Sequence, residues 1–194
     1  MEIKRPESRQ PIPPHAKRVF EGDIFDVYQW EQVLFDGSSK IFEKVRREDT
    51  VVILPSTADR KLIFVEDEQP ARGTVLTFPA GRMDKEGESP FETATRELLE
   101  ETGYESENWF LYKAYHPITK VDWAIYVFVA KECKKTQDAN PGPGEKIRVS
   151  LLTLDEIIEK IRDPQFIGDD IALDLMEAKY EPEARKLLEK KLFG

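Results

Sequence analysis

Hydrophobic and polar positions divide the chain into a polar start, a run of β-type segments and a helical end. Apolar, β-forming stretches recur at residues 50–54, 62–66, 74–78, 109–115, 123–130 and 147–152. Polar turns separate them, and continuous apolar runs of this length indicate strands that are buried on both faces. The pattern therefore predicts a mixed sheet at the centre of the fold.

One helix interrupts these strands, and both of its ends carry strong signals. Ser89, Pro90 and Glu92 combine an N-cap, a first-turn proline and a capping box. Gly103 stands where a glycine commonly ends a helix. The sequence therefore predicts a helix over residues 90–102.

The carboxyl-terminal part is helical by the same criteria. Thr153 and Glu156 form a second capping box, which starts a helix that we expect to end near residue 162. Residues 170–180 and 183–193 also have helical patterns, and Pro182 separates them. The expected fold class is α/β, with a mixed sheet flanked by helices.

The amino-terminal part differs from the rest. Residues 1–17 hold four prolines among charged residues and predict an extended or disordered arm. Residues 18–48 are rich in β-formers, and Asp36 and Gly37 mark the turn of a hairpin. We therefore divide the chain into an arm (1–17), a small β segment (18–48) and a main domain with carboxyl-terminal helices (49–194).

Composition and charge exclude some classes of protein. The net charge of −9 over 194 residues argues against a general binder of nucleic acid or of anionic membranes. Cys133 is the only cysteine, so no intramolecular disulfide or cysteine metal cluster is expected. No signal-peptide pattern and no long apolar run is seen, so we expect a cytoplasmic protein that does not span a membrane.

The predicted helix carries acidic residues toward its buried side. On a helical wheel Ala94 and Leu98 lie on the apolar arc, Glu101 projects within about 20° of Ala94, and Glu97 lies within about 60°. Carboxylates crowded at the margin of a core repel one another and lose hydration unless a cation joins them. Oxygen ligands of this kind suit Mg²⁺, so the helix is a candidate metal site.

At these residues the chain resembles the Nudix hydrolases. The family signature is a glycine, a glutamate and then Arg-Glu-apolar-x-Glu-Glu-x-Gly-apolar. The matching positions are Gly81, Glu88, Arg96, Glu97, Leu98, Glu100, Glu101, Gly103 and Tyr104. Six residues separate Gly81 from Glu88, where the family usually has five, which we interpret as a one-residue loop insertion. The resemblance implies a Nudix-type α/β/α sandwich.

Features outside the signature resemble the branch of ADP-ribose pyrophosphatases and nucleoside-diphosphate-sugar hydrolases. They include Pro79-Ala80-Gly81 before the signature and Glu145 before the last strand. This resemblance implies metal-dependent hydrolysis of a nucleoside diphosphate linked to a sugar, such as ADP-ribose to AMP and ribose 5-phosphate. Two alternatives stay open. One is a Nudix hydrolase of another nucleotide, namely a GDP-sugar, a dinucleoside polyphosphate or an oxidised nucleoside triphosphate, and the other is a non-catalytic nucleotide sensor.

The resemblance also implies roles for individual residues. Glu97 and Glu101 match the main metal ligands, Glu100 matches a further ligand or helper, and the Ala80 carbonyl matches a backbone ligand. The expected ion is Mg²⁺ or Mn²⁺. Arg96 matches an arginine that orients these glutamates, and it can reach Glu92 and Glu100 along the helix.

The resemblance points less directly to the residues that act on the attacking water and on the substrate. Glu145 is the only carboxylate between residues 139 and 149, and we expect it to act as general base or as an extra ligand. Glu100 is the alternative base. Arg72 is a candidate phosphate contact. The amino-terminal sheet of this branch often forms a homodimer, so we expect a homodimer that acts on a small-molecule nucleotide.

Overall fold

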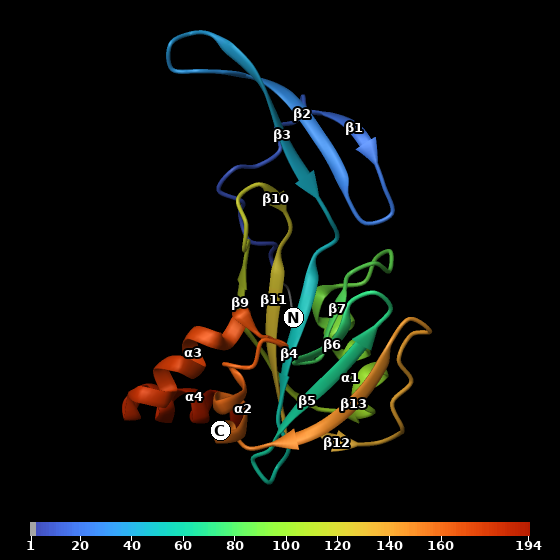
Figure 1. Cartoon of the computed structure of the whole chain (residues 1–194), viewed down its shortest axis with the longest axis vertical. Helices are drawn as coiled ribbons and strands as arrows, with labels where there is room; N and C mark the ends of the chain where they lie inside the picture. Colours follow the sequence, from blue (N-terminus) through green and yellow to red (C-terminus); the bar gives the residue numbers. More distant parts are fainter. Residues whose placement is uncertain (1–2) are drawn as a thin grey trace.

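The computed structural model describes residues 3–194, except for the side chain of Asp169. Its elements run from the amino-terminal strands through a mixed α/β body to three carboxyl-terminal helices (Figure 1). The longer strands are β1 (Lys17–Glu21), β2 (Asp26–Val33), β3 (Ser39–Arg46), β4 (Thr50–Pro55), β5 (Leu62–Gln69), β6 (Gly73–Thr77), β9 (Asn108–Tyr115), β11 (Ile125–Lys131) and β13 (Lys146–Leu152). The short strands are β7 (Ala80–Arg82), β8 (Tyr104–Glu105), β10 (Val121–Asp122), β12 (Lys134–Lys135) and β14 (Phe166–Ile167). The helices are α1 (Pro90–Thr102), α2 (Leu154–Lys160), α3 (Asp169–Tyr180) and α4 (Pro182–Phe193).

Two mixed sheets form the body. One has the order β7-β4-β11-β9, in which β4 and β11 are parallel. The other has the order β13-β5-β6-β14, with β5 antiparallel to both β13 and β6. Their apolar strands are buried on both faces, as the continuous apolar runs predicted.

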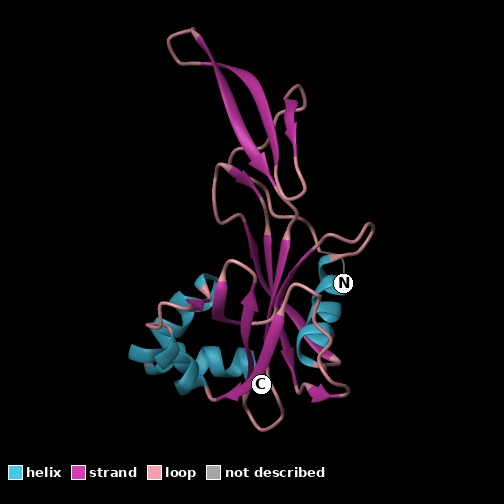
Figure 2. Cartoon of the chain, turned by 45° about the vertical axis from the view of Figure 1, so that its right-hand side comes forward, coloured by secondary structure: helices cyan, strands magenta, loops and turns pink. Residues whose placement is uncertain are grey.

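Alternate residues of β4 divide the core into two layers. Val51 and Ile53 belong to the cluster that packs on Ala94 and Leu98 of α1. Val52 and Leu54 face the opposite way, into the cluster built on α2, α3 and α4. Helices therefore cover both sides of the strands (Figure 2), and the predicted α/β/α sandwich is confirmed.

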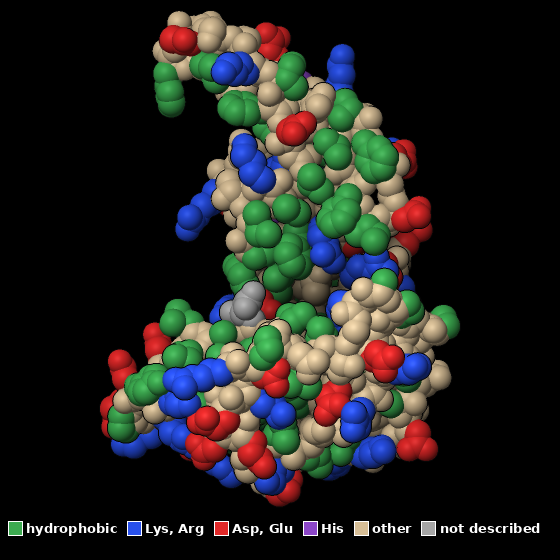
Figure 3. Space-filling view, viewed as in Figure 1, with side chains coloured by type: hydrophobic (Ala, Val, Ile, Leu, Met, Phe, Trp, Pro, Cys, Tyr) green, Lys and Arg blue, Asp and Glu red, His purple; other side chains and the backbone are tan. Residues whose placement is uncertain are grey.

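A separate amino-terminal sheet projects from this body. It has the order β1-β2-β3-β10, and β2 and β3 form the expected hairpin, whose turn includes Gly37 at φ 83°. In Figure 1 this hairpin extends away from the two larger sheets. Strand β10, which pairs parallel to β3, ties it to the chain just before β11. Apolar side chains are exposed over this lobe (Figure 3).

The segment that precedes β1 lies against this sheet. Residues 3–16 form no helix or strand. Lys44 is only 1% exposed, and its ammonium donates to the Ser8 hydroxyl (2.9 Å) and the Gln10 carbonyl (2.6 Å). Arg5 is held by Asp49 and Asp122. Polar contacts therefore fix this segment to the junction between the amino-terminal sheet and the body of the protein.

Some boundaries differ from the sequence expectation. The strand predicted at residues 123–130 begins only at Ile125. Val121 and Asp122, just before the predicted range, form the separate strand β10 and pair with β3. The two-residue strands β8, β10, β12 and β14 were not expected, since such short pairings leave no periodic pattern. Among the described residues, no helix combines the length and apolar character needed to cross a membrane.

Candidate active site

Helix α1 begins and ends as its sequence predicts. The Ser89 hydroxyl accepts from the Glu92 amide (3.3 Å), and the Glu92 carboxylate accepts from the Ser89 amide (2.8 Å). Gly103 ends the helix at φ 74°, and a Cβ there would stand 2.1 Å from the Gln137 carbonyl oxygen. Glycine is therefore required both for the backbone angle and for the close approach of the following loop.

Glu101 is the most buried carboxylate of this helix, with 7% exposure. It lies about one turn beyond Leu98 and about two turns beyond Ala94, which fix the inward face of α1. Its Oε2 accepts from the Ala80 amide (3.2 Å). Within residues 3–194, no cationic side chain contacts it. Burial raises the Glu101 pKa well above its usual range, and the charges of Glu97 and Glu145 raise it further.

Glu97 lies between this buried edge and the surface. Burial raises its pKa to about 7, against the opposing effect of Arg96. A Cβ on Gly81 would stand 2.0 Å from the Glu97 carboxyl carbon. The glycine of β7 therefore makes room for this carboxylate, and Gly81 lies against α1.

Arg96 gathers three glutamates. Its guanidinium forms a bidentate pair with Glu88, with both distances 2.9 Å, and contacts Glu97 at 2.7 Å and Glu100 at 3.0 Å. The predicted contact with Glu100 is present. The contact with Glu92 is not formed, because Glu92 caps the helix instead. The Arg96 side chain is 16% exposed, so this network is more restrained than an ordinary surface ion pair.

Glu100 faces a different direction from Glu101. Its side chain is 42% exposed, and it contacts Arg96 and the ammonium of Lys85 (3.7 Å). It does not line the cavity into which Glu101 faces. The three predicted ligands thus lie on one helix, with two at the buried edge and one toward solvent.

A cavity of about 180 Å³ brings Glu101 together with residues from other elements. Glu145, which precedes β13, lines it, and burial followed by the charge of Asp67 raises the Glu145 pKa. Arg72, in the turn between β5 and β6, lines it as well and forms an ion pair with Asp67. The structure therefore brings Glu101, Ala80, Glu145 and Arg72 to one place.

Two residues of this cavity were not predicted as site residues. Asp67 is 9% exposed, and Gln69 donates to it (3.1 Å) and to Glu145 (3.2 Å). A signal was present in the sequence, because Val65, Asp67 and Gln69 alternate along β5. A charged residue at a position equivalent to a buried valine marks a polar site on the inner face.

The carboxylates of the candidate site have the charge to bind a divalent cation, although they do not already form a cluster around one point. In the described part of the chain, no three acidic, histidine or cysteine side chains form a ready cluster. Glu97, Glu101 and Glu145 nevertheless each have a pKa raised by burial and by neighbouring carboxylates. A cation between them would relieve this repulsion, and oxygen donors of this type suit a hard divalent ion.

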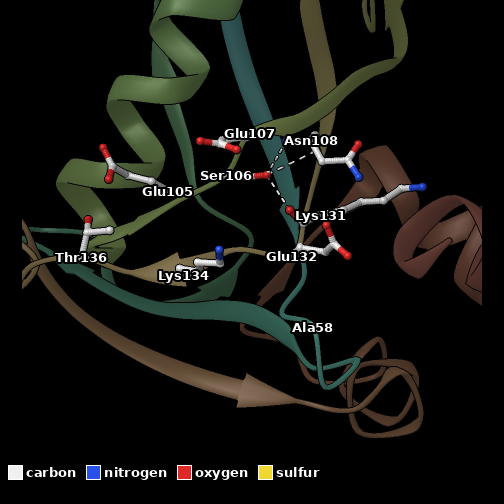
Figure 4. Close-up of a pocket in the computed structure, with 9 residues that line it drawn as sticks. All are labelled: Ala58, Glu105, Ser106, Glu107, Asn108, Lys131, Glu132, Lys134 and Thr136. Atoms are coloured by element: carbon white, nitrogen blue, oxygen red, sulfur yellow. Dashed lines mark hydrogen bonds between the residues drawn. The ribbon is translucent and has the colours of Figure 1, made fainter.

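A larger cavity, of about 540 Å³, lies elsewhere (Figure 4). Ser106 is at its centre, and its hydroxyl donates to the Lys131 carbonyl (2.5 Å) and accepts from the Asn108 amide (2.9 Å). Its walls carry both glutamates and lysines, so the charges there are mixed. None of the predicted site residues lines it. We therefore base the candidate site on the arrangement of carboxylates and not on the size of a cavity.

Comparison with known proteins shows the family of the chain. A protein-family model described as NUDIX domain matches residues 46–169. This range includes both mixed sheets and helix α1, and it begins after β1 and β2 of the amino-terminal lobe. The chain belongs to the Nudix family. It is a Nudix-type hydrolase, and enzymes of this family act on small-molecule nucleotides and generally use divalent metal ions.

The chain is similar to two relatives of known name and to one solved structure. The chain is 34% identical over 153 residues to a methanol dehydrogenase activator of Bacillus methanolicus, covering 76% of this chain and 81% of the relative. It is 29% identical over 148 residues to an ADP-ribose pyrophosphatase of Bacillus subtilis (strain 168), covering 75% and 80%. The crystal structure of an ADP compounds hydrolase has a TM-score of 0.71 at 22% identity, covering 93% of this chain and 99% of that one. The expected resemblance to the ADP-ribose pyrophosphatase branch is confirmed.

Proposed function

We propose that this Nudix enzyme hydrolyses the diphosphate bond of a nucleoside diphosphate linked to a sugar, with ADP-ribose giving AMP and ribose 5-phosphate. The observation that carries the proposal is the shared cavity of Glu101, Glu145 and Arg72. It combines the acids Glu101 and Glu145, whose charges a metal ion would balance, with the Arg72 guanidinium, which can bind a phosphate. The similarity to the Bacillus subtilis pyrophosphatase supports the choice of substrate.

The metal site of the proposal lies along α1. Glu97 and Glu101 would hold Mg²⁺ or Mn²⁺ together with Glu100 and the backbone carbonyl of Ala80. An ion held there would neutralise the diphosphate oxygens and polarise the phosphorus centre. Arg96 orients these ligands, because one guanidinium contacts both Glu97 and Glu100 while Glu88 anchors it from the other side.

Glu145 is the proposed general base. Its raised pKa favours uptake of a proton from the attacking water at neutral pH. The loop that carries it is pinned by a turn, since the Glu145 amide donates to the Gly142 carbonyl (3.0 Å). Glu100 is the alternative base, in which case Glu145 is an extra ligand. Arg72 binds a phosphate oxygen opposite the carboxylates.

The proposal includes a homodimer formed through the amino-terminal lobe (residues 18–48). Large apolar side chains exposed on this lobe are Val19, Phe20, Ile24, Phe25, Val33, Phe35 and Ile41. An exposed apolar surface of this extent requires a covering partner, and a second copy is the occupant that this branch of the family suggests. Sizing with light scattering at micromolar concentration should give twice the chain mass, and a monomeric mass would count against the dimer.

The proposal places the enzyme in the cytoplasm. The support is chemical, because the single cysteine, Cys133, is a buried free thiol that needs no oxidising compartment. Fractionation of cells with an antibody to the protein tests this location.

One assay separates the proposed function from its alternatives. The purified protein is incubated with ADP-ribose, ADP-glucose, GDP-mannose and a nucleoside triphosphate, with Mg²⁺ and with chelator, and the products are separated by ion exchange. Metal-dependent release of AMP, fastest from ADP-ribose, is the expected result. Faster cleavage of another compound would favour a different Nudix substrate. Nucleotide binding without cleavage would favour a sensor.

A further inference from the structure

The face of β5 that meets the cavity carries an acid which the proposed function has not used. Strand β5 places Val65, Asp67 and Gln69 on one face, and its register sets Asp67 opposite Val75 of β6 and Ile147 of β13. All three β5 residues line the cavity of Glu101. Asp67 is therefore fixed by the sheet at the floor of the site rather than on a mobile loop.

Asp67 is the centre of a polar chain that joins the two sides of the cavity. Its Oδ2 receives the Arg72 guanidinium and the Gln69 amide (3.1 Å). The same Gln69 nitrogen donates to Glu145 Oε1 (3.2 Å). A side-chain amide has two N–H groups, and both are used here. The order Arg72, Asp67, Gln69 and Glu145 thus connects the β5–β6 turn to the loop before β13.

The turn that carries Arg72 is bent back toward Asp67. The Arg72 amide donates to the Gln69 carbonyl (3.2 Å), Ala71 has φ 64°, and Gly73 has φ 77°. A positive φ is unfavourable for alanine and persists only where the surroundings impose it. The ion pair with Asp67 closes this turn and gives the Arg72 guanidinium a defined position.

Asp67 is poorly placed to stabilise the fold. Its Oδ1 is buried and, within the described structure, has no hydrogen-bond partner. Its charge also adds to the repulsion at Glu101 and Glu145. An unsatisfied buried oxygen and like-charge repulsion both cost stability. The gain from Asp67 must therefore lie in the contacts of Oδ2.

We propose that Asp67 is a positioning residue for binding of the substrate diphosphate. It holds the Arg72 guanidinium at the cavity and, through the Gln69 amide, fixes the position of Glu145. The inference rests on the proposed function in taking Arg72 as a phosphate contact. It predicts that loss of the Asp67 charge acts mainly on substrate binding, because Asp67 pairs directly with Arg72 but reaches Glu145 only through the neutral Gln69 amide.

A double-mutant cycle with steady-state kinetics on ADP-ribose tests this. Asp67→Asn and Arg72→Gln should each raise KM about 10-fold, the change expected when a charged hydrogen bond is lost, with a much smaller effect on kcat. The double variant should have the KM of Arg72→Gln alone. Additive effects, or an unchanged KM in Asp67→Asn, would overturn the inference. A merely structural role would lower the melting temperature without this coupling.

Glu68→Gln is the matched control, because Glu68 is the neighbouring acid on the exposed face of β5 and its carboxylate pairs with Lys146. Its KM should equal that of the wild type. Calorimetric titration with ADP and Mg²⁺ separates failure of the inference from failure of the proposed function. Weaker ADP binding in both Asp67→Asn and Arg72→Gln supports the inference even if ADP-ribose is not cleaved. Equal binding by all variants contradicts it.

Discussion

Glu101 of α1 and Asp122 of β10 are buried to nearly the same degree, with 7% and 5% exposure, but their surroundings are opposite. Asp122 receives Arg5 at 3.1 Å and Arg46 at 2.9 Å. Burial acts to raise the Asp122 pKa, and hydrogen bonds from Arg46 and Arg5 outweigh it, so the pKa is lowered. At Glu101 burial raises the pKa, and the neighbouring acids Glu97 and Glu145 raise it further.

We interpret this difference as one between a structural carboxylate, Asp122, and a proposed cation ligand, Glu101. The Asp122 group lies where the amino-terminal segment, β3 and β10 meet, and its charges are balanced within the protein. At Glu101 the balance is incomplete, so the site gains free energy when a cation arrives. Burial and acidity alone do not identify a site, whereas an acid that lacks a cationic partner does.

The largest effect expected from this comparison is the loss of activity in Glu101→Gln. Replacing a buried carboxylate with a neutral amide removes a cation ligand, and turnover should fall about 100- to 1000-fold, as for other lost electrostatic groups in active sites. The melting temperature without metal should not fall, because one repulsive charge is removed. Unchanged turnover at limiting Mg²⁺, or a variant that does not fold, would contradict the assignment.

The reciprocal change is Asp122→Asn. It removes the charge that two arginines share, and it should lower the free energy of unfolding by about 1–2 kcal/mol, since both arginines are half-exposed and partly screened. Urea denaturation measures the loss. Turnover per folded molecule should stay within about twofold, because the two sites do not share contacts. A large loss of turnover with intact stability would remove the distinction between the two acids.

The pH dependence of stability should reveal a second acid of the candidate site, Glu97. The folded-state pKa of Glu97 is about 7, above its usual value, so folding favours the protonated carboxyl. Its contribution is fully present below the unfolded pKa and is lost as pH rises through about 7. In chelator, the wild type should lose more melting temperature between pH 5 and pH 8 than Glu97→Gln does. Parallel curves for the two proteins would show that Glu97 does not titrate in this range.

The smallest effect is expected at an exposed ion pair. Glu183 and Lys186 form such a pair on α4, with side chains 86% and 72% exposed. Glu183→Gln should change the free energy of unfolding by less than about 0.5 kcal/mol, because water screens both charges. The same urea titration measures it. A loss as large as that of Asp122→Asn would show that burial is not what separates these pairs.

Much of this comparison could be predicted from the sequence. Helix α1 has the predicted bounds because its caps are local signals, and Glu101 is buried as the helical wheel indicated. The two core layers follow from the apolar runs. Local patterns therefore predicted the fold and one face of the site.

Contacts between distant segments were not predictable in the same way. Arg96 was expected to reach Glu92, but it pairs with Glu88, eight residues away, because the loop before α1 folds back. Asp67, Gln69 and Arg72 meet Glu145 only through the register of β5 with its neighbours. Sequence spacing gives neighbours on a single element, while strand pairing decides which elements face each other.

Titration with Mn²⁺, followed by electron paramagnetic resonance of the free ion, tests the central claim most directly. The wild type and Asp122→Asn should bind the ion with equal affinity, because both keep the carboxylates of α1. Glu101→Gln should bind it at least about tenfold more weakly, as expected for disruption of a metal site. Equal binding by all three proteins would contradict the assignment of Glu101 as the buried ligand of a divalent cation.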